Sequence, residues 1–180
     1  MPTAIGTLYL HSNATLTGDI SGWTLPATLN DFYCAYCTLS GDISGWVIPV
    51  GVQFFRIQEN EFSGDISGWV LPAGMIFFYI EDNTLSGTPD ISGNVSMRSY
   101  RYYDNGLIQA NVDAILLSVY NRRMGFTWAT PALNVGGTND APTGTYQAQC
   151  PPADGKELAF ELVNDSCGDG FILWAVTFTA

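Results

Sequence analysis

A six-residue motif, Gly-Asp-Ile-Ser-Gly-Trp, occurs three times at a constant spacing of 23 residues. It occupies 18–23, 41–46 and 64–69, and Gly87 opens a looser copy 23 residues further on. A fixed period of 20–50 residues is typical of a solenoid, in which each repeat forms one coil. The motif therefore predicts a stack of coils, each in contact only with its neighbours.

A second pattern, made of apolar residues, precedes each hexapeptide. Apolar side chains stand at positions one, four and six, a turn residue stands at position nine, and another apolar residue follows. The alternation at positions four and six places those side chains on one face of a short strand. The copies begin at Ile5, Leu29, Val52, Met75 and Met97, and their ninth positions are Asn13, Cys37, Asn60, Asn83 and Asn105. Since one coil cannot bury its apolar face alone, stacked coils must share a core.

Together the two patterns resemble the leucine-rich repeat, L-x-x-L-x-L-x-x-N/C-x-L, over about residues 5–140. The continuation at 39–43, Leu-Ser-Gly-Asp-Ile, is most similar to the plant-receptor type, with serine where that type has proline. The resemblance implies an α/β repeat solenoid that is mainly β, a right-handed coil with a parallel concave sheet. The ninth-position residues are expected to form a hydrogen-bonded ladder. Trp23, Trp46 and Trp69 are expected to stack on one another near the convex side.

The repeat gives way to a helical pattern after Leu107. Asn111, as an N-cap, precedes apolar residues at helical spacing, which predicts a capping helix at 111–122. A degenerate last repeat follows at 131–140, with Leu133 and Val135 inward. This helix plus final repeat is similar to the closing coils of bacterial and bacteriophage leucine-rich-repeat proteins.

The last part of the chain does not follow the repeat. The solenoid is therefore assigned to residues 1–145, and residues 146–180 to a small α+β cap. A helix is expected at 157–163 and a strand at 171–178. Cys150 and Cys167 flank that helix, and we predict a disulfide between them, which would indicate an oxidising destination.

Composition narrows the function classes. Among 180 residues there are 17 Asp plus Glu, six Lys plus Arg and one histidine, for a formal net charge of −11. An acidic chain without clustered cations does not offer a nucleic-acid surface. The scarcity of histidine and lysine argues against triad catalysis and multi-histidine metal sites. No apolar run reaches the roughly 18–20 residues that span a bilayer. We expect no enzymatic activity, no cofactor and no membrane insertion.

Cys34 and Cys37 have the Cys-x-x-Cys spacing of a redox or metal-binding motif. In the repeat register, however, Cys34 takes the inward sixth position and Cys37 the ninth, so a structural role is expected. Zinc would also need two further ligands.

Acidic residues recur at equivalent positions of successive coils. The hexapeptide acids lie about one coil, roughly 5 Å, apart, which leaves two interpretations open. They could form a calcium ladder, or each could accept hydrogen bonds from its own turn. These weak calcium candidates are Asp19, Asp42 and Asp65. A second group falls at strand exits, where solvated acids are expected: Glu59, Glu81, Asp82 and Asp104.

The residues between the inward positions are expected to face outward from the concave sheet. Six aromatic side chains and two arginines gather there, the residue types that mark binding surfaces. The candidate binding residues are Tyr9, Tyr33, Phe54, Arg56, Phe77, Tyr79, Arg101 and Tyr103, with His11, Gln58 and Glu81 beside them. Such a surface could stack on sugar rings or form a protein interface. Alternatively, the C-terminal cap or a neighbouring subunit covers it.

These features point to a non-enzymatic recognition or assembly protein. The closing-coil similarity, the lack of an export signal at the N-terminus and the predicted disulfide favour a bacteriophage virion component, such as a tail-fibre, receptor-binding or capsid-decorating protein. The alternative is the ligand-binding region of a bacterial surface adhesin, and a carbohydrate-active enzyme is a remote third. The expected partners are subunits of a larger particle or a cell-surface glycan or protein. Because the first coil lacks a polar cap, preceding sequence or a partner chain is expected at its open edge.

Overall fold

The computed structural model describes residues 4–127, 131–145, 147–148, 150–164, 167–168 and 174–178. One set of strands comprises β1 (Thr7–Tyr9), β3 (Asp31–Tyr33), β5 (Phe54–Arg56), β7 (Phe77–Tyr79), β9 (Ser99–Arg101), β10 (Ala132–Asn134) and β11 (Ala175–Thr177). A second set comprises β2 (Thr17–Asp19), β4 (Thr38–Asp42), β6 (Glu61–Asp65) and β8 (Thr84–Ser86). The helices are α1 (Gln109–Arg122) and α2 (Gly155–Asn164), and the short 3₁₀ turns are η1 (Ile66–Gly68) and η2 (Arg123–Gly125).

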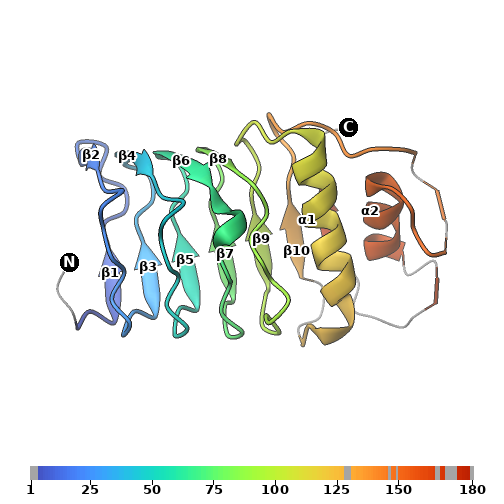
Figure 1. Ribbon diagram of the computed structural model, residues 1–180, viewed down its shortest axis with the longest axis horizontal. Helices are drawn as coiled ribbons and strands as arrows, with labels where there is room; N and C mark the ends of the chain where they lie inside the picture. Colours follow the sequence, from blue (N-terminus) through green and yellow to red (C-terminus); the bar gives the residue numbers. More distant parts are fainter. Residues whose placement is uncertain are drawn as a thin grey trace.

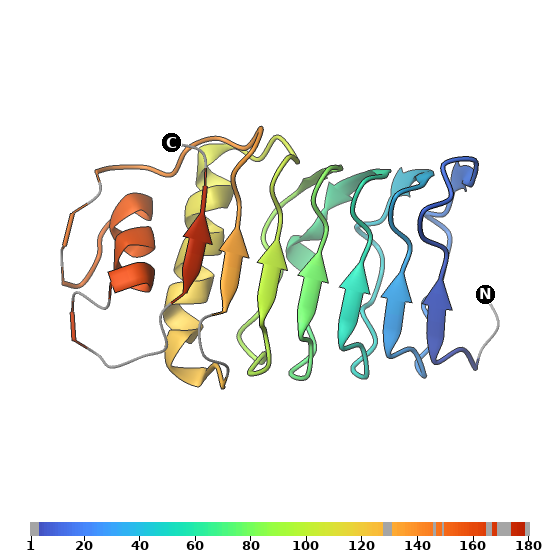
Figure 2. The same ribbon diagram turned by 180° about the vertical axis from the view of Figure 1, so that it is seen from behind.

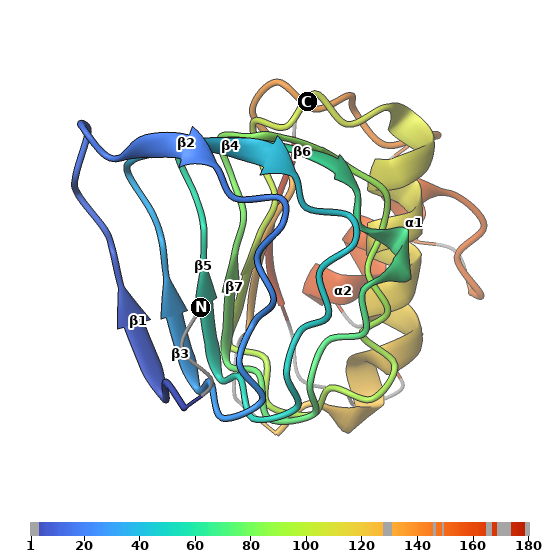
Figure 3. The same ribbon diagram turned by 60° about the vertical axis from the view of Figure 1, so that its left-hand side comes forward.

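The chain forms a β-solenoid, as the period predicts. The first set of strands makes a parallel seven-stranded sheet in the order β1-β3-β5-β7-β9-β10-β11, and the second a four-stranded sheet in the order β2-β4-β6-β8. The coils follow one another along the long axis of the molecule (Figure 1). Seen closer to that axis, the seven-stranded sheet lies on one side and α1 on the opposite side, with the four-stranded sheet between them (Figure 3).

The core runs through the middle of all the coils. Phe32, Phe55 and Phe78 are the central residues of β3, β5 and β7, and the strand register places them in line. All three are fully buried, and their rings stack at centroid distances of 5.3 and 5.8 Å. The repeated inward phenylalanine thus supplies the shared core that a single coil lacks.

The ninth-position residues join each coil to the one before it. Asn83 Nδ2 donates to the Ile57 carbonyl (3.1 Å), and its Oδ1 accepts from the Phe62 amide (3.0 Å). The same pair of bonds recurs at Asn60, Asn105 and Asn139. At Cys37 the thiol donates to the Leu10 carbonyl at 2.8 Å. This arrangement is the hydrogen-bonded ladder that the repeat register predicts.

The tryptophans pack differently from the expectation that they stack on one another. Trp46 meets Phe32 edge-on at 5.8 Å, and Trp69 meets Phe55 in the same way. Each indole Nε1 also donates, at 3.3 Å, to a serine carbonyl of the preceding hexapeptide. Edge-to-face packing suits the ring quadrupoles and leaves the indole N–H free to find an acceptor, which explains the difference.

The capping helix starts earlier than the sequence predicts. Ile108, rather than Asn111, is the N-cap of α1, and it makes no side-chain capping bond. The carboxylate of Asp140, 31 residues away, accepts from the Gln109 amide instead (3.0 Å). A carboxylate here also suits the positive end of the helix dipole. The buried face of α1 is the predicted one: Val112, Ile115, Leu116 and Val119.

The C-terminal segment is continuous with the solenoid. Its strand β11 pairs in parallel with β10, and Val176 lies opposite Leu133. Part of the strand expected at 171–178 falls outside the described residues. The helix α2 covers the end of the molecule against α1 and β11 (Figures 1 and 2).

The predicted disulfide between Cys150 and Cys167 is present. The two cysteines are 17 positions apart, and closing a loop of this length stabilises a fold by about 3 kcal/mol on the chain-entropy argument. We therefore expect a reductant to lower the unfolding midpoint of the chain by roughly 5–10 °C, measured by thermal denaturation. A Cys150→Ser/Cys167→Ser variant should unfold at the lower midpoint with or without reductant; a midpoint equal to that of the oxidised chain would contradict the prediction.

Candidate binding surface on the seven-stranded sheet

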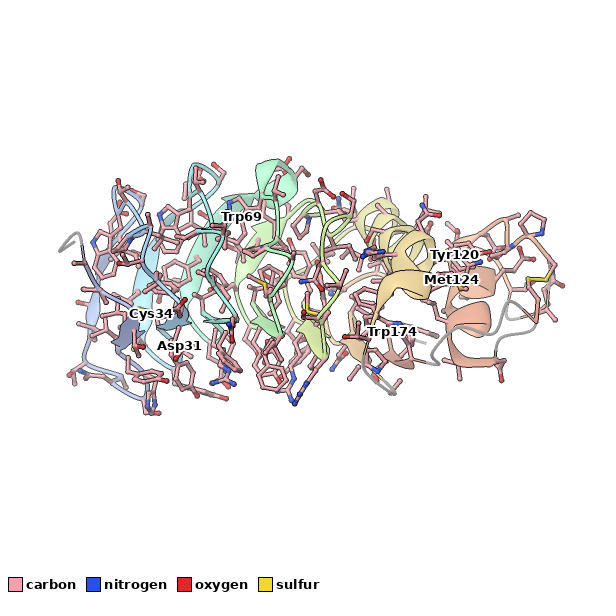
Figure 4. All side chains as sticks on the ribbon, turned by 90° about the horizontal axis from the view of Figure 1, so that it is seen from below. Asp31, Cys34, Trp69, Tyr120, Met124 and Trp174 are labelled. Atoms are coloured by element: carbon pink, nitrogen blue, oxygen red, sulfur yellow. A yellow bond between two sulfur atoms is a disulfide. The ribbon has the colours of Figure 1, made fainter. Side chains whose placement is uncertain are left out.

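The outward side chains of the seven-stranded sheet form regular columns. Parallel pairing aligns Tyr9, Tyr33, Arg56, Tyr79 and Arg101 on five consecutive strands. A neighbouring column consists of Asp31, Phe54, Phe77 and Ser99. We call this outward surface of β1 to β9 the sheet face; its strands lie side by side in Figure 2, and Asp31 lies on that side in Figure 4, away from Trp69.

Arg56 lies at the centre of the aromatic residues of the sheet face. Its guanidinium carbon is 5.1 Å from the ring centroid of Tyr33, 5.2 Å from Phe77, 5.5 Å from Phe54 and 5.6 Å from Tyr79. Rings at these distances attract a cation through their negative faces. The arginine therefore holds four half-buried rings together as one surface.

The same kind of packing extends to both ends of the sheet face. Arg101 lies 4.2 Å over the Tyr79 ring, toward the C-terminal coils. At the other end Tyr33 stacks on His11 at 4.5 Å and meets Tyr9 edge-on at 5.9 Å. Tyr9 is 57% exposed. The structure thus brings the predicted binding residues of five coils into one continuous band.

Glu81 contradicts the expectation that the strand-exit acids are solvated. Its side chain is 2% exposed, because Arg101 and Tyr103 lie over it. Its Oε1 is 3.6 Å from Arg101 Nη1 and accepts from the Tyr103 hydroxyl at 3.5 Å. Burial raises the pKa of this carboxyl to about 7, although Arg101 acts in the opposite direction.

Three buried polar atoms beneath the sheet face have no hydrogen-bond partner among the described residues. They are Glu81 Oε2, Gln58 Oε1 and Arg56 Nε. An unpaired buried polar atom costs about 1–3 kcal/mol, so such atoms are rare in folded proteins. Because all three atoms are buried, ordered water could satisfy them in place, whereas a polar ligand would reach them only if the covering side chains moved.

The raised pKa of Glu81 predicts a pH dependence of stability. The folded-state pKa of about 7 exceeds the usual 4.5, so the folded state binds the proton more tightly. The stabilisation is complete below pH 4.5 and is lost as the pH rises through 7. Between pH 5 and 8 we expect the free energy of unfolding of the native chain to fall by on the order of 2 kcal/mol relative to Glu81→Gln, measured by urea titration. A constant difference between the two proteins would contradict the burial of this carboxyl.

The hexapeptide acids bond to their own turns. Asp19, Asp42 and Asp65 each accept from the amide of the serine two residues on, at 2.8–2.9 Å. These bonds lower the pKa of all three carboxyls. In the part of the chain that the structure describes, no group of three or more His, Cys, Asp or Glu side chains is placed to hold a metal ion. The geometry of the turns matches the interpretation that each acid accepts hydrogen bonds from its own turn, rather than the calcium ladder.

Cys34 and Cys37 are both buried and unbonded to each other. Burial raises the pKa of the Cys34 thiol to about 12, which disfavours the reactive thiolate. Their positions in the core and the ladder are those of structural residues.

An apolar surface on the opposite side of the coils is not apparent from the repeat pattern. Val47, Val50 and Val70 are 62–91% exposed there. Two grooves of about 500 Å³ run between the coils at these valines, with Trp46 in both. The signal in the sequence is the apolar residue beside each Ile-Pro or Leu-Pro pair, on a segment that the core does not cover.

Comparisons with known proteins return no match to a family model, to a curated protein or to a solved structure. Within the described ranges no helix is long and apolar enough to cross a membrane. The functional argument therefore rests on the sheet face itself.

Proposed function

We propose that this protein is a non-enzymatic recognition module of the leucine-rich-repeat type, which binds a glycan on its sheet face. The observation that carries the proposal is the band of half-buried rings around Arg56, with unpaired polar atoms beneath it. Aromatic rings offer flat apolar faces to the C–H faces of sugars, and neighbouring polar groups bind the hydroxyls. A band of rings with the guanidinium groups of Arg56 and Arg101 among them is suited to a sugar chain that runs across several coils.

The setting that we propose is a bacteriophage virion, in a tail-fibre, receptor-binding or capsid-decorating role. The disulfide fits an oxidising, extracellular location. A virion protein made in the cytosol would reach such surroundings at lysis. The leucine-rich-repeat assignment is supported by the ladder at the ninth positions and by the parallel sheet. A bacterial surface adhesin would use the same surface in the same way.

A glycan array tests the proposal. We expect the native chain to bind a defined set of glycans, and Tyr33→Ala and Tyr79→Ala each to weaken binding about tenfold, since tenfold corresponds to about 1.4 kcal/mol. Val50→Ala is the matched control, because Val50 is 91% exposed on the opposite side and should bind as the native chain does. Absence of glycan binding, with the sheet face buried against another protein chain in the native assembly, would refute glycan recognition.

A further inference from the structure

Side chains of the repeat hydrogen-bond each inner coil to the coil before it. The ladder asparagine makes two bonds to the preceding coil, as at Asn60, whose Nδ2 donates to the Cys34 carbonyl (2.7 Å) and whose Oδ1 accepts from the Leu39 amide (3.1 Å). In the same coil the hexapeptide tryptophan makes a third bond, because Trp69 Nε1 donates to the Ser44 carbonyl at 3.3 Å. Trp46 Nε1 bonds the Ser21 carbonyl in the same way. These side chains all lie on the side of the coil that faces the preceding coil, and we call that side the receiving side.

The hexapeptide glycine completes the receiving side. Gly41 has a φ of +123° and lies directly against the Asp19 carboxylate of the preceding coil, so a side chain there would collide with it. Gly64 meets Asp42 in the same way. Glycine is required at this position for its positive φ and for the close approach of the aspartate.

The first coil has the same receiving side, which contacts no other coil in the part of the chain that the structure describes. The Asn13 side chain is exposed, and its side-chain hydrogen bond is a local one, with Oδ1 accepting from Thr15 Oγ1 at 2.8 Å. Gly18 keeps the positive φ, at +129°, yet no atom of the other described residues lies within 4 Å of where its side chain would be. Trp23 is partly exposed, whereas Trp46 and Trp69 are buried, and its Nε1 has no acceptor among the described residues.

Both sheets also end at this coil. β1 is the terminal strand of the seven-stranded sheet and β2 that of the four-stranded sheet, so among the described residues no strand pairs with the outer edge of either. Apolar side chains that are buried in the inner coils are partly exposed here: Ile5, Leu8, Leu10 and Leu16. Unpaired strand edges with apolar side chains are templates for a further strand.

We propose that the first coil is a docking site for one further coil of the same repeat pattern. Such a coil would place its hexapeptide aspartate against Gly18 and its serine carbonyl at Trp23 Nε1. Its backbone would bond both the Nδ2 and the Oδ1 of Asn13. The occupant is thus a polypeptide that bears the Asp-Ile-Ser-Gly turn, and docking is independent of what the sheet face binds.

A second copy of this chain does not supply the required groups. Two first coils that meet face to face would each present a receiving side, with neither aspartates nor serine carbonyls opposite. The other end of the described chain is covered by α2, against α1 and β11, and carries no hexapeptide turn. Self-association through β1 is therefore an outcome that would contradict the proposal.

The test adds one coil to the full chain. A copy of residues 24–47, which contains a ladder position and a hexapeptide, is fused ahead of Met1. We expect the unfolding midpoint to rise by about 5 °C or more, and hydrogen exchange at the amides of β1 and at Trp23 Nε1 to slow at least about tenfold. A scrambled 24-residue extension is the control and should change neither.

A second variant links the gain to the receiving side. Asn13→Ala/Trp23→Phe removes the proposed bonds and keeps the indole position filled by a ring. In the unextended chain this double variant should change the unfolding midpoint by less than about 1 °C. In the extended chain it should remove at least half of the rise in midpoint that the added coil gives. The proposal is overturned if the repeat extension acts no differently from the scrambled one, if the double variant keeps the full gain, or if the unextended chain sediments as a dimer with β1 already protected.

Discussion

Replacement of Phe55 by alanine is expected to lower the free energy of unfolding by about 3–5 kcal/mol, the range for large buried aromatic side chains. Phe55 is fully buried, and its ring contacts Phe32, Phe78 and Trp69. The cavity would therefore break the core at the junction of three coils. For a chain of this length, the unfolding midpoint should fall by roughly 10 °C or more, measured by thermal denaturation.

Phe54 is the matched control for Phe55. The two are consecutive residues of β5, but Phe54 points outward and is half-buried on the sheet face. Phe54→Ala should cost less than about 1.5 kcal/mol of stability, because its partly exposed ring leaves no closed cavity. Similar losses of stability for the two variants would show that β5 is not placed with Phe55 inward.

The second large effect is expected at the ladder. Asn83→Ala removes the bonds to the Ile57 carbonyl and the Phe62 amide. The Phe62 amide then lacks its side-chain acceptor in the interior, whereas the Ile57 carbonyl keeps Asn60 Nδ2 as a donor (3.0 Å). Since an orphaned buried group costs about 1–3 kcal/mol, the free energy of unfolding should fall by about 2 kcal/mol in urea denaturation.

Asn13→Ala serves as the comparison, because Asn13 is at the same repeat position but its side chain bonds within its own coil, to Thr15 Oγ1. Its loss should change stability by about 0.5 kcal/mol or less. Equal effects at Asn13 and Asn83 would mean that the asparagines act through their own turns, and the ladder would then contribute little to holding the coils together.

The repeat register is what could be predicted from the sequence. Because the hexapeptides recur at a constant spacing, one strand position fixes the equivalent position in every other coil. Tyr33, Arg56 and Tyr79 could thus be assigned to one column before the structure. The inward phenylalanines and the ladder positions follow from the same register.

Features that depend on contacts between distant residues could not be predicted in this way. Asp140 caps α1 from 31 residues away, so the local N-cap signal at Asn111 was misleading. β11 lies outside the repeat and joins the sheet by pairing with β10. No periodicity in the last part of the chain indicates that pairing.

For the sheet face, too, one part could be predicted from the sequence and another part could not. Its residues could be listed from the register, but their packing could not. Glu81 shares its position with Gln58 and Ala35 of earlier coils, so the register alone does not distinguish a solvated acid from a buried one. Its burial follows from Arg101 and Tyr103 of the next coil, which lie over it.

The measurement that tests the account most directly is hydroxyl-radical footprinting of the native chain with and without the glycan selected on the array. Ligand on the sheet face should strongly reduce oxidation of Tyr33 and Tyr79, and leave Tyr120 of α1 and the exposed valines Val47 and Val50 unchanged. Protection of the valines, with Tyr33 and Tyr79 still oxidised at the rate of the free chain, would place the ligand on the opposite side and contradict the account.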